Sequence, residues 1–224
     1  GFMIEIVATT EKKDTILENL HYIHNTQKHD SMAKKYNHAI EKFCLPSDEK
    51  YFCFRHDDLT INTPMDVVRY KLDKLFEDGK VGVAGLIGTY ILEPSCVWWV
   101  PNRGVNTAGR IIQGYPDGTT APMNDWPGTH RDLATVDGCC LFISRKMLEA
   151  GIRFDENLKN YHFYDADICC QALANGFNVS TVDIEAIHKS TGAAPQDIEQ
   201  YRKVFFDKWS AKIDKWPISR YTKF

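Results

Sequence analysis

Short apolar runs alternate with segments of helical spacing along the first half of the chain. Residues 3–8 form a run rich in β-branched side chains, which predicts a strand, and residues 14–27 are expected to follow it as a helix. Apolar residues recur at intervals of three and four in residues 31–43 and 65–76, which predicts two more helices. Strands that alternate with helices are typical of an α/β domain.

The pattern continues to the end of the chain, with an irregular segment in the middle. Residues 93–132 are rich in glycine, proline, asparagine and tryptophan, and about forty residues is longer than an ordinary loop. We expect this segment to bind substrate and to contain short strands. The last helix is expected to pack on the domain rather than to lie on a membrane surface. The remaining strands are predicted at residues 51–55, 81–86, 134–143 and 178–183, and the remaining helices at residues 145–150, 165–175 and 196–212.

Composition and charge narrow the class of protein. With 224 residues and 43% hydrophobic content, the chain is expected to form one domain that buries about 70% of its unfolded surface. The net charge of −3 is spread along the chain, which argues against nucleic acid as a partner. The apolar run at residues 81–100 is interrupted by three glycines and by Glu93-Pro94, so no membrane span is predicted.

The number and spacing of the cysteines indicate the redox environment in which the protein is expected to fold. There are seven, an odd count without a C-x-x-C spacing, which argues against both a disulfide framework and a structural zinc site. A reducing environment is therefore expected. Because no signal peptide is found, the protein is predicted to be cytoplasmic.

Polar residues follow three of the predicted strands. They are Thr9-Thr10-Glu11, His56-Asp57-Asp58 and His188. In open α/β sheets, ligands bind beyond the carboxyl ends of the strands. The Asp57-Asp58 pair is suited to hold a divalent cation against a diphosphate, although two aspartates also mark a turn. His188 is suited to complete such a metal site with a neutral imidazole, or it is a residue that only makes hydrogen bonds.

Two further carboxylates lie at the start of a predicted helix. Asp165 and Asp167 are two positions apart, so their side chains point in different directions. One of them is expected to cap the helix, while the other points into the cleft as a general base. In the alternative, both carboxylates only stabilise the positive end of the helix dipole.

In chain order, these segments resemble the GT-A glycosyltransferases of the family-2 type, in particular the glycosyltransferase-like branch with an F-x-H-x-D metal motif. Here the motif reads Phe54-Arg55-His56-Asp57-Asp58. The resemblance extends from Met3 to about Gly192. Four other segments are similar to ordered elements of that family: a helix at residues 31–40, a V-G-V-A-G-x-x-G strand at residues 81–88, the acceptor-side strand at residues 136–143 and the F-D-E to E-D-x-D block at residues 154–168.

The resemblance implies a GT-A fold, a Rossmann-like α/β architecture with a mostly parallel central mixed sheet flanked by helices. About residues 1–90 are expected to form the nucleotide-sugar half, residues 91–195 the acceptor half and residues 196–224 a C-terminal helix, all within one domain. The implied activity is metal-dependent, inverting transfer of a sugar from a nucleotide-diphosphate donor, with a UDP-sugar favoured. The acceptor is expected to be a hydroxyl of a glycan, glycolipid or glycoprotein.

The resemblance also assigns roles to single residues. Asp165 falls at the position of the catalytic base, but Tyr164 replaces the glutamate that precedes it in the family, so Asp167 remains an alternative base. Asp58 and His188 are expected to bind Mn²⁺ or Mg²⁺. The residues expected to contact the donor are Ala8, Thr9, Thr10, Glu11, Asn37, His56 and Asp57, and those on the acceptor side are Trp98, Trp99, Asp137 and Gly138.

The sequence departs from the family pattern in one element, and two other functions compete with glycosyl transfer. The family's second strand, which carries an acidic residue for the nucleotide base, is expected here to be shortened to a loop at residues 26–30. A sugar nucleotidyltransferase needs a glycine-rich basic loop after the first strand, and residues 8–13 lack the glycines. A non-catalytic carbohydrate-binding protein would need only exposed aromatic rings such as Trp98, Trp99 and Trp126.

Overall fold

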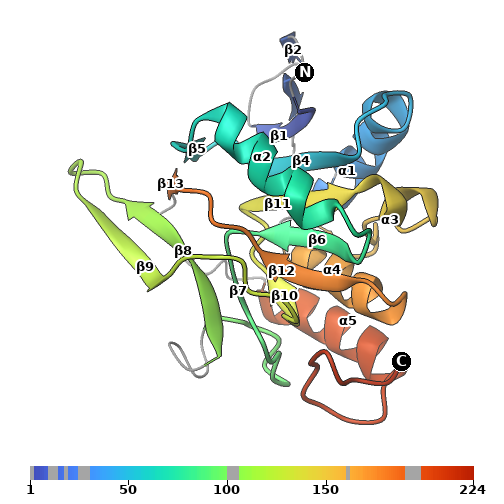
Figure 1. Ribbon diagram of the computed structural model, residues 1–224. Coiled ribbons are helices and arrows are strands. Elements are labelled where there is room, and N and C mark those ends of the chain that lie inside the picture. The colour runs from blue at the N-terminus through green and yellow to red at the C-terminus, as the bar shows by residue number, and fades with distance from the viewer. Residues whose placement is uncertain are drawn as a thin grey trace.

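Two mixed β-sheets with helices packed around them form the structure, a computed structural model that describes residues 3–9, 15–17, 20–24, 31–99, 106–159, 162–189 and 198–224 (Figure 1). The first sheet has seven strands in the order β12-β6-β11-β4-β1-β3-β2. Their bounds are β12 (Asn178–Thr181), β6 (Val81–Gly85), β11 (Cys140–Ser144), β4 (Tyr51–His56), β1 (Glu5–Thr9), β3 (Leu20–His24) and β2 (Thr15–Leu17).

The second sheet carries a long hairpin. Five of its six strands follow the order β10-β7-β8-β13-β5, and the sixth, β9, pairs with β8 outside that path. Figure 1 shows the β8–β9 hairpin reaching away from the first sheet. The bounds are β10 (Thr135–Val136), β7 (Ile87–Thr89), β8 (Thr107–Gly114), β13 (Ala186–His188), β5 (Leu59–Ile61) and β9 (Thr120–Trp126).

Strand directions correct the expectation of a mostly parallel sheet. In the first sheet, β12–β6, β4–β1 and β1–β3 are parallel pairs. The pairs β6–β11, β11–β4 and β3–β2 are antiparallel. The antiparallel pairs around β11 have a simple cause. The chain enters β11 beside the carboxyl ends of β4 and β6, so β11 runs antiparallel to both of these neighbours.

Strand β4 separates two apolar cores, because successive side chains of a strand point to opposite faces. Tyr51 and Cys53 pack with apolar residues of α2 (Met65–Phe76). Phe52 and Phe54 pack on the other face with α1 (Met32–Ala39). Both faces are covered, which explains why β4, β6 and β11 read as continuous apolar runs.

The helices agree closely with the predicted ranges. Helix α1 begins after Ser31, whose Oγ accepts a hydrogen bond from the Lys34 backbone N–H at 3.2 Å, and it continues as the short π-helix η1 (Ile40–Cys44). The other helices are α3 (Arg145–Glu149), α4 (Tyr164–Ala174) and α5 (Ile198–Ser210). Within the described ranges, every helix is too short or too polar to span a bilayer.

Helix α5 packs on the domain, as expected. Phe205 and Trp209 are buried, and Asp167 of α4 receives the polar contacts that join the two helices. Lys208 Nζ lies 2.6 Å from Asp167 Oδ1 and 2.8 Å from Asp155 Oδ2, and Trp209 Nε1 donates to Asp167 Oδ1 at 2.9 Å. Burial raises the pKa of the Asp167 carboxyl, and the ammonium of Lys208 opposes that change.

This contact predicts a large effect on stability. Lys208→Met removes the charge that faces a fully buried carboxylate, and we expect a loss of about 2 to 4 kcal/mol in the free energy of unfolding. Lys203→Met on the same helix removes an exposed pair with Asp207 and should cost under about 0.5 kcal/mol. Urea unfolding of both variants measures the difference; equal losses would contradict the assignment.

Two predicted elements are wrong. Residues 14–27 do not form a helix where they are described, because β2 and β3 lie there and β3 pairs in parallel with β1 over five residues. Residues 26–30, where the family's second strand was expected to be shortened to a loop, lie outside the described ranges. The strand predicted at residues 134–143 is two strands, β10 and β11, in different sheets. Asp137-Gly138-Cys139 separates them.

Candidate active site

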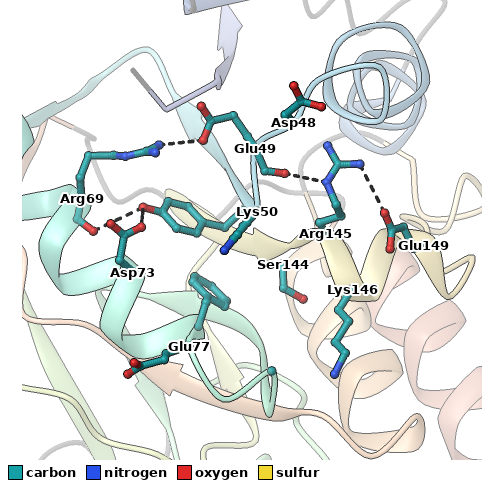
Figure 2. A pocket seen from close by; sticks show the side chains of 13 residues that line it. Asp48, Glu49, Lys50, Arg69, Asp73, Glu77, Ser144, Arg145, Lys146 and Glu149 are labelled. Carbon is teal, nitrogen blue, oxygen red and sulfur yellow. Dashed lines mark hydrogen bonds and ion pairs between the residues drawn. The ribbon is translucent and has the colours of Figure 1, made fainter. Parts of the chain in front are cut away.

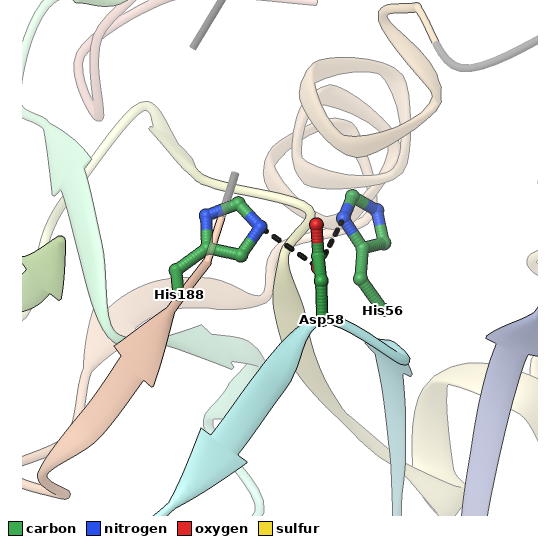
Figure 3. Close-up of side chains that lie close together, drawn as sticks. All are labelled: His56, Asp58 and His188. Atoms are coloured by element: carbon green, nitrogen blue, oxygen red, sulfur yellow. Dashed lines mark ion pairs between the residues drawn. The ribbon is translucent and has the colours of Figure 1, made fainter. Parts of the chain in front are cut away.

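Two histidines and an aspartate meet beyond the carboxyl end of β4. His56 is the last residue of β4, Asp58 lies in the turn to β5, and His188 ends β13. Strand β13 pairs antiparallel with β5, which places His188 opposite Leu59 and next to Asp58. In Figure 3, Asp58 lies between the two imidazole rings. The three potential ligand atoms lie within 4.8 Å of one another.

The cluster has the properties of a cation site. Asp58 Oδ1 lies 3.0 Å from His188 Nε2 and 3.9 Å from His56 Nδ1. Within the described part of the chain, Asp58 Oδ1 and His188 Nε2 are buried atoms without a hydrogen-bond partner, because their close approach lacks the geometry of a hydrogen bond. A buried carboxylate oxygen and a buried imidazole nitrogen that converge in this way fit a divalent cation, for which imidazole and carboxylate are common ligands.

The charges in the cluster depend on one another. Burial alone would raise the pKa of Asp58, but the two imidazoles more than offset it, and the net pKa is lowered. Burial alone would lower the pKa of His188, but the facing Asp58 carboxylate offsets it, and the net pKa is raised. The pKa of His56 is lowered by burial. His56 is therefore neutral near pH 7, as a metal ligand must be.

Tyr164 connects this cluster to the start of α4. Its Oη lies 2.7 Å from His56 Nε2 and donates to the Gly138 carbonyl oxygen at 3.1 Å. The sequence marked Tyr164 only as a departure from the family pattern, and its contact with His56 was missed. A tyrosine directly before the predicted base, at a helix start, is the one signal that pointed to this position.

Asp165 lies on the other side of Gly138. Its Oδ2 accepts from the Gly138 N–H and its Oδ1 from the Ala166 N–H, both at 2.8 Å. Burial, followed by the nearby Asp137 carboxylate, raises the pKa of Asp165 to about 7, although the backbone hydrogen bonds oppose the change. A carboxylate that titrates near neutral pH is suited to take a proton from a hydroxyl.

The backbone around Asp165 is tightly constrained. Phe163, which precedes α4, has a φ of 61°, the left-handed region that non-glycine residues seldom adopt. A Cβ on Gly138 would lie 2.4 Å from Tyr164 Oη and 3.0 Å from Asp165 Cβ, so no other residue fits there. Strained backbone of this kind is held in place by its surroundings and gathers at functional sites.

The residues predicted to lie on the acceptor side are found next to Asp165. Trp98 Nε1 donates to Asp137 Oδ1 at 3.2 Å, and the Cys139 N–H donates to Asp137 Oδ2 at 3.0 Å. Trp99 packs edge-on against Trp98, with ring centroids 5.9 Å apart. Asp137 and Gly138 occupy the break between β10 and β11, so the interruption of the predicted strand forms part of this site.

Other predicted residues lie at the margin of the site. Ala8 is the β1 partner of His56, and it accepts a hydrogen bond from the Asp57 N–H at 3.1 Å. The side chain of Asp57 is exposed. Thr9 ends β1, and Thr10 and Glu11 lie outside the described residues.

Asn37 and Asp167 have other partners. The Asn37 amide pairs with the backbone of Phe154, with Nδ2 donating to its carbonyl at 2.8 Å and Oδ1 accepting from its N–H at 2.9 Å. These bonds join α1 to the segment before α4. Asp167 is fully buried against α5, away from Asp165. Both side chains are thus engaged in holding elements around the site.

A cavity of about 680 Å³ lies elsewhere, at the opposite end of β4 from His56. Figure 2 shows its charged lining from α2, α3 and the segment before β4. Many of these charges are already paired: Arg69 with Glu49 at 3.0 Å and Arg145 with Glu149 at 3.5 Å. The His56, Asp58 and His188 cluster, and not this cavity, carries the candidate chemistry.

Comparison with known proteins adds three findings. A family model described as "Glycosyltransferase like family" matches residues 18–209. No curated protein matches the sequence. Among solved structures, the crystal structure of A197 from STIV is similar, with 12% identity, a TM-score of 0.49, and coverage of 85% of this chain and 86% of that one.

Proposed function

Because this chain belongs to the glycosyltransferase-like family, we propose that it is a metal-dependent glycosyltransferase of the GT-A type. The donor is a nucleotide-diphosphate sugar, with UDP favoured, and the acceptor is a hydroxyl of a glycan, glycolipid or glycoprotein. One observation carries the proposal: a cation-type cluster and a carboxylate with a pKa of about 7 lie on either side of Gly138.

The cluster supplies the ligands. His56 Nδ1, Asp58 Oδ1 and His188 Nε2 would hold Mn²⁺ or Mg²⁺. When bound, the cation supplies Lewis-acid stabilisation of negative charge on the diphosphate leaving group. Two imidazoles among three ligands favour Mn²⁺, because Mg²⁺ is bound mainly by oxygen atoms.

Asp165 acts as the base in this proposal. The Gly138 and Ala166 N–H groups hold its carboxylate in place, so that it can take the proton of an acceptor hydroxyl. Attack of that oxygen on the face of the anomeric carbon opposite the leaving group inverts its configuration. Trp99 is half-buried and offers ring surface for the acceptor sugar, while Trp98 is buried and its Nε1 donates to Asp137.

Thermal denaturation with UDP, GDP, CMP and dTDP sugars, with and without Mn²⁺, tests the proposal. A ligand at 100 times its dissociation constant stabilises a protein by about 2.7 kcal/mol. We expect stabilisation by one class of nucleotide only when metal is present, and Mn²⁺ to bind about tenfold more tightly than Mg²⁺. Stabilisation by a glycan alone, with neither metal nor nucleotide, would favour a carbohydrate-binding protein instead.

A further inference from the structure

The proton on the His56 ring decides whether this residue can bind a cation. A neutral imidazole carries one N–H and one free lone pair, and the hydrogen bond made by one nitrogen determines which of them is free. Nδ1 of His56 faces the Asp58 carboxylate at 3.9 Å, while Nε2 faces Tyr164 Oη at 2.7 Å. The tautomer therefore depends on Tyr164.

Tyr164 has a single hydroxyl proton, and that proton already has an acceptor. The hydroxyl donates to the Gly138 carbonyl at 3.1 Å, and this carbonyl has only lone pairs to offer. Tyr164 Oη must then accept at its contact with His56, so His56 Nε2 carries the proton. The lone pair of Nδ1 is left facing Asp58 and His188.

We propose that Tyr164 is a positioning residue that holds His56 in the Nε2–H tautomer and so prepares Nδ1 as a cation ligand. The inference rests on the cation site of the proposed function and adds the residue that orients one of its ligands. Partners of this kind, which hydrogen-bond the outer nitrogen of a ligating histidine, fix the ring orientation and strengthen metal binding.

The surroundings of Tyr164 hold its hydroxyl in place. The ring is 2% exposed and packs edge-on against Tyr36, with centroids 6.0 Å apart, and against Phe154 at 6.1 Å. Any side chain on Gly138 would meet the hydroxyl. These contacts hold the hydroxyl 2.7 Å from His56 Nε2.

Gly138 joins this arrangement to the base. Its carbonyl accepts from Tyr164, and its N–H donates to Asp165 Oδ2 at 2.8 Å. The tautomer of His56 and the orientation of Asp165 therefore depend on the same glycine. A shift of the 137–139 loop would disturb both the cation ligand and the base.

Mn²⁺ titration of the Tyr164→Phe protein, followed by electron paramagnetic resonance, tests the inference without any turnover. We expect affinity to fall 10- to 100-fold relative to wild type. Tyr36→Phe is the matched control: it removes the hydroxyl of an adjacent buried tyrosine that has no hydrogen-bond partner among the described residues, so Mn²⁺ affinity should not change.

Nitrogen-15 NMR of the histidine rings reads the tautomer directly, in protein without metal. Wild type should show protonated Nε2 at His56, and Tyr164→Phe should show a mixture of both tautomers. This signature distinguishes positioning from a general loss of stability, and both spectra are recorded below the unfolding transition.

The outcomes separate the two proposals. If wild type and Asp58→Ala are alike in failing to bind Mn²⁺, the cation site is wrong and this inference falls with it. If wild type binds Mn²⁺, Asp58→Ala does not, and Tyr164→Phe matches wild type, only the role of Tyr164 is overturned. A protonated Nδ1 at His56 in wild type overturns it as well.

Discussion

Replacing Asp165 with asparagine is expected to lower turnover by roughly a hundredfold or more, while the donor still binds. Asparagine keeps the size of the side chain but cannot take a proton from the acceptor, and Asp165 is not part of the His56, Asp58 and His188 cluster. Steady-state kinetics and donor titration measure the two effects. Asp207→Asn, an exposed carboxylate of α5, serves as the control and should retain full activity.

The same variant should change the pH profile. The pKa of Asp165 is raised to about 7, so the carboxyl group is protonated and inactive as a base below that pH. The wild-type rate should therefore increase as pH rises through about 7 and level off above it. The residual rate of Asp165→Asn should lack this step. Wild-type turnover in the variant, or an unchanged step, would remove Asp165 from the mechanism.

Asp58→Ala is expected to abolish metal-dependent donor binding. The substitution removes the one carboxylate of the cluster and leaves two imidazoles, which we expect to weaken Mn²⁺ binding by about a hundredfold or more. Titration of the nucleotide sugar in the presence of Mn²⁺ measures the loss. Asp183→Ala removes an exposed carboxylate paired with Lys71 at 3.6 Å and should bind donor as wild type does. An unchanged titration of Asp58→Ala would contradict the metal assignment.

Strand-end residues were the most informative part of the sequence. His56 and Asp58 follow an apolar run, and that position predicted their place beyond the end of β4. The approach of His188 depends on the pairing of β13 with β5, two three-residue strands that were not predicted. Runs this short carry too little periodicity to be distinguished from loops.

The error at residues 14–27 has a physical cause. Ile16, Leu20 and Ile23 follow helical spacing, and the same residues also fit two short strands. Pairing with β1 decides between them, and that contact is not encoded in the local pattern.

The two aspartates at the start of α4 were also only partly predictable from the sequence. Their spacing of two correctly indicated different directions, but only the packing of α5 shows that Asp167 is the one turned away. The position of Tyr164 before the predicted base was visible in the sequence, but its contacts were not, because both partners are distant in sequence: Gly138 is 26 residues away and His56 is 108 residues away.

The pairing of β13 with β5 also bears on biosynthesis. His56 and Asp58 leave the ribosome about 130 residues before His188. At about 5–20 residues per second, this delay is on the order of ten seconds. For that time the nascent chain holds only two of the three cluster residues, one imidazole and one carboxylate, which is a weak site for any cation. In the proposed site, tight metal binding would therefore begin only after β13 has been made, and a truncated product that ends before β13 would lack the third ligand.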